Sequence, residues 1–262
     1  MSFWEAVSKI LDLYGPLMLK GTWITILLAI VGTVVGSCLG LLIGSYKTIP
    51  ITSKTALWKK VIYHLFNFVL TAYITVFRST PMMVQAMVGF YGYTWITGHR
   101  IPPLYFGMVI ISINTGAYMA EIVRGGIISV DKGQYEAAHS IGMTHGQTMF
   151  NVVLPQAIRN IMPAVGNEFI INMKDSCVLS VISVSELFFV TKSAAGATFQ
   201  TFPAFLIASV IYLILTVTLT EILKRVERRM DGPDSYTIME AVSTNQIVLD
   251  KELARQQTKR RK

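Results

Sequence analysis

Hydrophobic residues gather in long blocks that short polar segments separate. The first block, Gly21 to Gly44, has 24 residues and no charged side chain. At 1.5 Å of rise per residue, a helix of this length can cross a hydrocarbon core about 30 Å thick. Three later blocks are similar and predict further membrane-spanning helices. They cover residues 104 to about 123, about 163 to 189, and 202–223.

The stretch 61–93 is also apolar, but Arg78-Ser79-Thr80-Pro81 interrupts it. Threonine followed by proline is typical of a helix start. We therefore expect an elbow helix over 61–77 at the cytoplasmic interface and a spanning helix over 81–96. One long bent span over the whole stretch is the alternative. With 81–96 counted as a crossing, the sequence predicts an all-α membrane protein with five transmembrane helices.

The distribution of Lys and Arg predicts the orientation of these spans. With the N-terminus outside, the inner segments 46–60, 124–160 and 224–262 hold 17 of the 23 Lys and Arg. Basic residues favour the cytoplasmic side, so we expect the N-terminus outside and the C-terminus inside. A six-span arrangement would place the four lysines of 46–60 outside and is disfavoured. The predicted organisation is an external segment 1–18, a membrane domain 19–224 and a basic cytoplasmic tail 225–262.

Composition narrows the class of protein further. Only 15% of the residues are charged, against about 25% in soluble domains, and the mean hydropathy is +0.51. Ten of the 23 Lys and Arg lie in 224–262, which indicates a local basic tail and not a nucleic-acid surface. Such a tail either is a solvated end or touches anionic lipid. Cys38 and Cys177 lie in apolar stretches and have no disulfide or metal-ligand spacing.

A cytoplasmic segment after the third span contains a specific pattern. It has Glu136-Ala137-Ala138, then Gly142, then Val152-Val153-Leu154-Pro155. This spacing resembles the E-A-A-x3-G-x9-I-x-L-P motif of ABC importer permeases, with Val152 in place of the usual Ile. The resemblance implies a short helix, a glycine turn and a second segment that together form a rigid knob. In that family the loop, here about 131–156, docks on the cytoplasmic ATPase.

Other stretches extend the resemblance over about residues 15–230. Residues 77–81, Phe-Arg-Ser-Thr-Pro, are similar to the family's F-R-G-T-P, with Ser79 replacing Gly. Residues 114–126, 132–134, 154–157, 166–169 and 174–176 are similar to the polar amino acid branch. The resemblance implies a type I ABC importer permease fold in a bacterial plasma membrane. The implied partners are an ABC ATPase dimer, a second permease subunit, identical or homologous, and an extracytoplasmic amino acid binding protein.

Four glycines of the first span share one helix face. Gly32, Gly36, Gly40 and Gly44 are spaced four residues apart, and small residues at this spacing let two membrane helices approach closely. Because the resemblance implies a pair of permeases, we expect this glycine face to form part of the interface between them.

Ionisable residues inside spans are costly unless they face a cavity or a partner, so they mark a candidate substrate path. At 100° per residue, two polar stripes are predicted on the third and fourth spans. The residues nearest a zwitterion are expected to be Asn114, Tyr118, Asp175 and Ser176. Asp175 would accept from the ammonium group, and the other three would donate to the carboxylate. Local pairing, for example of Glu121 with Arg124, is the alternative. The stripe of the third span consists of Asn114, Tyr118 and Glu121. The stripe of the fourth span consists of Glu168, Asn172, Asp175, Ser183 and Glu186.

The sequence predicts neither an enzyme nor a cofactor or metal site in this chain. No G-x-x-x-x-G-K-[ST] loop is present, and the four histidines lack metal-ligand spacing. ATP hydrolysis must then come from a separate subunit. An ion-coupled secondary transporter or channel is the alternative function, which inverted repeats would favour, and we find no such repeat. Because Val178 adds no second acid one turn beyond Asp175, an uncharged substrate such as glutamine or cystine is expected.

Overall fold

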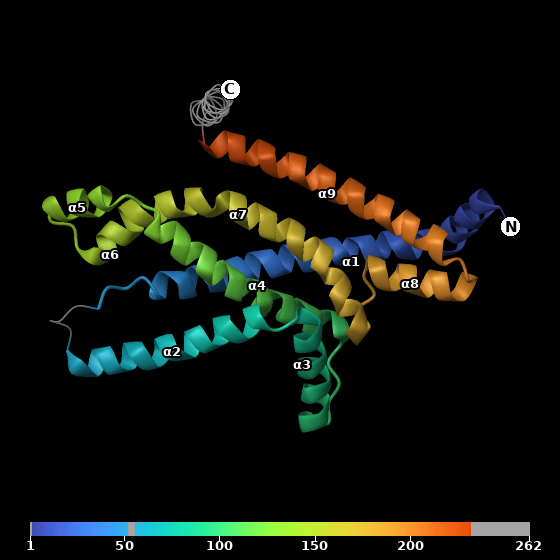
Figure 1. Cartoon of the computed structure of the whole chain (residues 1–262), viewed down its shortest axis with the longest axis horizontal. Helices are drawn as coiled ribbons and strands as arrows, with labels where there is room; N and C mark the ends of the chain where they lie inside the picture. Colours follow the sequence, from blue (N-terminus) through green and yellow to red (C-terminus); the bar gives the residue numbers. More distant parts are fainter. Residues whose placement is uncertain (1, 52–55, 232–262) are drawn as a thin grey trace, which may run out of the picture. The chain divides into compact units, whose positions relative to one another are not determined.

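The computed structural model describes residues 2–51 and 56–231, and all regular structure within them is helical (Figure 1). The chain forms two units, 1–219 and 220–262, and the arrangement below concerns the first. The predicted basic tail lies outside the described residues except for 225–231, which end the last helix. The helices are α1 Phe3–Tyr46, α2 Leu57–Ser79, α3 Met82–Thr97, α4 Pro103–Ile128, α5 Lys132–Ser140, α6 His145–Thr148, η1 Met149–Val153, α7 Leu154–Asp175, η2 Ser176–Ile182, α8 Leu187–Thr198 and α9 Thr201–Asp231.

Helix α1 begins far upstream of the predicted span. Ser2 caps it, since the Ser2 hydroxyl accepts from the Glu5 amide and the Glu5 carboxylate accepts from the Ser2 amide. The helix then continues through Pro16 to Tyr46. Residues 3–18, which we predicted as part of an external segment, are therefore the first turns of α1. Ile10 and Met18 are buried there in a cluster with α8 and α9.

The glycine face of α1 packs against α4 of the same chain. A Cβ at Gly36 would lie 2.7 Å from the Thr115 Cβ, and one at Gly40 would lie 2.6 Å from the Met119 carbonyl carbon. The prediction that this face forms the interface with a second permease is therefore wrong, because α4 already covers it. Gly32 and Gly44 face Ile111 and Val123 in the same way, so both helices advance by four residues per step and run parallel.

The other pairings give the directions of the remaining helices. α7 runs antiparallel to α4, since Gly126 faces Ile161 while Thr115 bonds to Asn172. α9 starts beside the start of α1, where the Phe202 and Phe3 rings are 6.1 Å apart. α2 is antiparallel to α1, because Tyr46 at the end of α1 stacks on Tyr63 near the start of α2. The direction of the long helices thus alternates along the chain. α1, α4 and α9 run one way, and α2 and α7 run the other way.

The second crossing is placed differently from the prediction. α2 has 23 residues and is long and apolar enough to cross a membrane, whereas α3 has 16 and measures only about 24 Å. The expected interfacial elbow is therefore a candidate span, and α3 turns across its direction (Figure 1). The expected break is confirmed, since Thr80 and Pro81 are extended. Lys59 and Lys60, which lie in the first turn of α2, had been assigned to the preceding loop.

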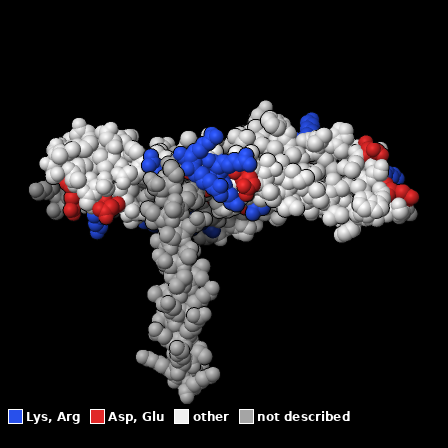
Figure 2. Space-filling model, turned by 90° about the horizontal axis from the view of Figure 1, so that it is seen from above, with Lys and Arg blue, Asp and Glu red and all other residues white. Residues whose placement is uncertain are grey.

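Four helices can span a membrane by length and composition, and a fifth span results if the bent pair is counted as one. The four are Phe3–Tyr46, Leu57–Ser79, Pro103–Ile128 and Thr201–Arg229, and the pair is His145–Ile182 with Leu187–Thr198, bent by 53°. Large apolar side chains cover much of the exposed surface of these helices. Figure 2 shows one face, on which charged side chains occupy only a few places. The chain is thus a multi-pass membrane protein.

The bent pair corrects the predicted polar stripe of the fourth span. The α-helix ends at Asp175, a 3₁₀-helix follows, and Ser183 is left-handed with φ 66°. A 3₁₀-helix has 3.0 residues per turn, so the 100° spacing does not continue beyond Asp175. Ser183 and Glu186 therefore do not extend the stripe of Glu168, Asn172 and Asp175.

We expect Gly40→Leu to destabilise the assembled protein by about 1–3 kcal/mol, because the added side chain must displace the Met119 backbone. The midpoint of thermal unfolding of the purified complex measures this. Gly196→Ala is the matched control, since a Cβ at Gly196 meets nothing within 4 Å. An unchanged midpoint for Gly40→Leu would show that the two helices tolerate separation.

Candidate functional site

A polar groove lies between the end of α1, the C-terminal part of α2 and the middle of α4. Its volume is about 430 Å³. Lys47 Nζ donates to Thr71 Oγ1 over 2.9 Å, and the Arg78 guanidinium lies 5.4 Å from the centre of the Tyr118 ring. The lining residues are Lys47, Thr71, Ile74, Thr75, Arg78, Ser79, Tyr118 and Glu121.

The charges of this groove have opposite signs within one small volume. Glu121 accepts from Arg124 over 2.9 Å, so the predicted local pairing of these two residues is confirmed. Neither Lys47 nor Arg78 forms an ion pair within the described residues. The groove thus offers two cations, hydroxyl groups and a carboxylate that is already shared with an arginine. Such a set can bind a small molecule that bears both an anionic and a cationic group.

Asn114 lies beside the groove and holds the break between α2 and α3. Its Nδ2 donates to Gln85 Oε1 over 3.0 Å and to the Phe77 carbonyl over 3.3 Å. Gln85 in turn donates to the Thr80 carbonyl over 2.9 Å. The Tyr73 hydroxyl donates to the Ile113 carbonyl on the same stretch of α4. Asn114 therefore fixes where α2 ends, and its carbonyl oxygen remains available beside the groove.

The other two predicted path residues lie where α7 continues into η2. Asp175 is exposed there, whereas Ser176 is buried and donates to the Met173 carbonyl over 2.9 Å. Among the described residues, no hydrogen bond joins this pair to Asn114 or Tyr118. The structure thus brings the predicted residues together as two pairs, one on α4 and one on α7 and η2.

Two further polar residues of the predicted stripe stabilise the fold. Asn172 is buried, accepts from Thr115 Oγ1 and donates to Thr33 Oγ1, both over 2.9 Å. It therefore connects α7 to α4 and α1. Glu186 is 0% exposed and caps α8, accepting from the Phe188 and Phe189 amides over 2.8 and 2.7 Å and from the Tyr212 hydroxyl.

The loop at about 131–156, which contains Glu136-Ala137-Ala138, forms a knob of short helices at the end of the unit opposite to α8 (Figure 1). Asp131 caps α5, whose end is followed by Gly142 with φ 82°. The glycine turn implied by the sequence is thus confirmed, since this backbone conformation favours glycine. Thr144 and Gln147 form a capping box at the start of α6. A π-helical turn, Met149–Val153, leads into Leu154 and Pro155 at the start of α7.

The knob has one buried side and one exposed side. Tyr135 and Met149 pack on the buried cluster of Ile127 and Val153, and burial raises the pKa of the Tyr135 phenol. Glu136 and Ala137 are exposed, whereas Ala138 is buried. Two large apolar side chains point outward as well, Ile141 at 77% and Phe150 at 74% exposure. A surface that combines these apolar groups with one carboxylate is suited to contact another protein.

The sequence matches a known family over most of the membrane domain. Residues 62–232 match the family described as binding-protein-dependent transport system inner membrane component. This chain belongs to that family. It is a permease subunit of an ABC importer, so ATP hydrolysis is performed by a separate subunit and the permease itself is not an enzyme. The family also implies an ATPase and a binding protein as partners.

Curated relatives resemble the permease over nearly their whole length. It is 34% identical to the arginine transport system permease protein ArtQ of Bacillus subtilis, covering 84% of this chain and 94% of that protein. The glutamine transport system permease protein GlnP of Escherichia coli is 35% identical, with coverage of 82% and 93%. The L-cystine transport system permease protein TcyB of Bacillus subtilis is 33% identical, with coverage of 87% and 91%.

Solved structures agree with the fold. The crystal structure of an amino acid ABC transporter with histidines has a TM-score of 0.74 and is 36% identical, covering 87% of the permease and 99% of that chain. The inward-facing MetNI methionine ABC transporter has a TM-score of 0.68 at 20% identity, with coverage of 82% and 96%, and supports the fold alone.

Sequence reasoning missed three residues of the groove region. Lys47 was counted only as a charge in an inner loop, and Arg78 only as part of a family-like stretch. Gln85 gave no signal, because an amide in an apolar helix does not reveal its partner. Arg78 could have been found, since a lone arginine inside an apolar block is expensive unless it faces a cavity.

Proposed function

We propose that this permease imports a polar amino acid, and that the groove between α2 and α4 lies on its path. The observation on which this depends is the groove's mixture of charges. The α-carboxylate of an amino acid fits the Lys47 and Arg78 cations, and its ammonium fits acceptors such as the Asn114 carbonyl. A volume of about 430 Å³ is in the usual range for small-molecule sites.

Asp175 and Ser176 complete the proposed path on the side of α7 and η2. Asp175 is exposed at the end of α7, where its carboxylate can accept from a passing ammonium group. Ser176 supports this turn through its bond to the Met173 carbonyl. A path with acceptors on one wall and cations on the other suits a zwitterion.

The groove also bears on the choice of amino acid. Lys47 and Arg78 contribute two positive charges, and Arg124 already neutralises the Glu121 carboxylate. This balance disfavours a cationic side chain, because the groove has no spare negative charge. We infer that the substrate is uncharged in its side chain, as glutamine and cystine are. The relatives include glutamine and cystine permeases and also an arginine permease, so this inference depends on the charges of the groove alone.

The proposed topology has five crossings of a bacterial plasma membrane, with the N-terminus outside and the C-terminus inside. Helices α1, α4 and α9 run in one sense and α2 and α7 in the other. Because α1 and α4 are parallel, α2 and α3 together amount to one net crossing, and a six-span arrangement does not fit. The distribution of Lys and Arg gives the sense of the whole set.

Two permease subunits, identical or homologous, are proposed to assemble on an ATPase dimer. The groove opens on the surface of a single chain, so a second subunit is needed to enclose the path. The coupling loop, about 131–156, is proposed to present Glu136, Ala137 and the exposed Phe150 to the ATPase. Ala138, Gly142, Leu154 and Pro155 then shape and anchor the knob.

The topology predicts that a cysteine at Ser2 is labelled from outside the cell and one at Ser140 only from inside. Both are exposed, and Cys38 and Cys177 would first be replaced by serine. A membrane-impermeant maleimide applied to intact cells and to inverted vesicles measures the side. Labelling of Ser2→Cys only in inverted vesicles would reverse the topology.

The coupling loop predicts that Glu136→Ala lowers the ATPase activity stimulated by the loaded binding protein, since the exposed carboxylate no longer contacts the ATPase. The order of preference among labelled amino acids should not change, because the groove is intact. Glu221→Ala, another exposed carboxylate, is the control. Full stimulation in Glu136→Ala would exclude this residue from the contact.

The path predicts that Arg78→Gln lowers uptake about tenfold through loss of one charge-assisted contact. Uptake of labelled glutamine, cystine and arginine into proteoliposomes holding the complete importer measures the effect. Asp175→Asn should also lower uptake while the ATPase stays bound. Lys59→Gln, an exposed lysine near the start of α2, should transport normally. Normal uptake by both path variants would place the substrate route elsewhere.

A further inference from the structure

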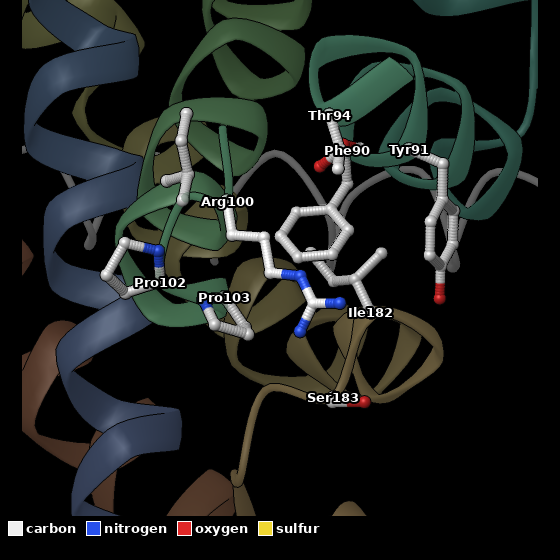
Figure 3. Close-up of a pocket in the computed structure, with 9 residues that line it drawn as sticks. Phe90, Tyr91, Thr94, Arg100, Pro102, Pro103, Ile182 and Ser183 are labelled. Carbon is white, nitrogen blue, oxygen red and sulfur yellow. The ribbon is translucent and has the colours of Figure 1, made fainter. Parts of the chain in front are cut away.

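A second cavity lies apart from the groove, where the end of α3, the α3–α4 connection and the end of η2 meet (Figure 3). Its volume is about 610 Å³, and none of its lining residues lines the groove. Most of the lining is aromatic, aliphatic or proline. The residues are Phe90, Tyr91, Thr94, Arg100, Ile101, Pro102, Pro103, Ile182 and Ser183.

Arg100 supplies the charge of this cavity. Figure 3 shows its guanidinium pointing into the space between Phe90, Ile182 and Ser183. It forms no ion pair within the described residues, and positions 82–120 contain neither Asp nor Glu. The N-terminus of α4, which starts at Pro103, adds partial positive charge nearby. The cavity therefore favours an anionic group at its mouth.

The inner walls of the cavity are apolar and firmly packed. Phe90 contacts Phe106 with ring centres 5.5 Å apart, and Ile182 is buried in the same cluster. Pro102 and Pro103 have restricted backbones, so the opposite wall is also fixed. An occupant must therefore combine an anionic group with an apolar part.

The exposed side chains of the helices that line the cavity indicate where such a molecule comes from. Tyr91 lines the cavity and is exposed, and Trp95 on α3 and Tyr105 on α4 are exposed as well, Trp95 at 87%. Exposed Tyr and Trp are enriched where a membrane meets water. The apolar side chains of Val88 and Ile96 on α3 are also exposed, which suits contact with lipid tails. At such a surface the abundant molecule with an anionic head and an apolar body is a phospholipid.

We propose that this cavity binds one phospholipid, with its phosphate on Arg100 and the start of an acyl chain against Phe90 and Ile182. Guanidinium binds phosphate through two parallel hydrogen bonds, which fixes the head group. The Ser183 hydroxyl, at the turn after η2, can donate to the same phosphate. The lipid then bridges α3 and the turn after η2, beside the place where these two elements already pack together.

The test uses the assembled permease and ATPase in nanodiscs of phosphatidylcholine and phosphatidylglycerol that contain a photoactivatable phosphatidylglycerol. Cross-linked peptides are mapped by mass spectrometry. We expect labelling near Phe90 and Ile182 to fall about tenfold in Arg100→Gln and much less in Arg100→Lys. Labelling of the exposed apolar face of α9, around Leu213, is the internal control and should stay constant. Arg159→Gln, an exposed arginine on α7, is the matched variant and should label as the wild type does.

Two outcomes would overturn the proposal. One is equal labelling of the cavity in Arg100→Gln and the wild type while the complex remains assembled. If docking of the binding protein is also weakened in that variant, Arg100 is assigned to a protein contact. The other outcome is loss of labelling when inorganic phosphate is added at about 50 mM, roughly enough to saturate a weak anion site, because free phosphate would then be the preferred ligand.

Discussion

The close parallel contact between α1 and α4 sets the position of everything else in the first unit. Glycine at every fourth residue of α1 removes the side chains that would otherwise hold the helices apart, so the backbone of Gly44 comes near the Ala120 carbonyl. In lipid no hydrophobic force drives helices together, and such contacts depend on dispersion between well-fitted surfaces. With α4 fixed on α1, the face that bears Asn114 and Tyr118 is directed toward α2.

The polar residues of the bundle divide into those that stabilise and those left available. Asn172 and Glu186 are buried and use their hydrogen-bonding capacity within the chain, because an unpaired polar group in a membrane is costly. Lys47, Arg78 and Asp175 are not buried. This difference in pairing, more than the identity of the residues, separates scaffold from candidate path.

The sequence predicted the apolar blocks, the break at Thr80–Pro81 and the glycine turn at Gly142, because each depends on a short local pattern. It did not predict which helix covers the glycine face, since a small-residue stripe has the same form whether its partner is in the same chain or another. It also extended a 100° spacing beyond Asp175, where the backbone changes to a 3₁₀-helix. The groove needed Lys47 and Arg78 to meet from two helices, a tertiary fact that periodicity cannot supply.

The continuity of the helix from His145 to Ile182 has a mechanical consequence. The exposed Phe150 and the buried Asn172 lie on one rod, about 33 Å apart along its axis. Asn172 is bonded to both α1 and α4, and Val153, Ala157 and Ile161 pack on α4 nearer the knob, so the rod is held along most of its length. A rod held in this way moves as one piece with α4 and α1. In the proposed coupling, a push on the knob would therefore displace Asp175 and η2 together with these helices, and not by tilting the rod against them.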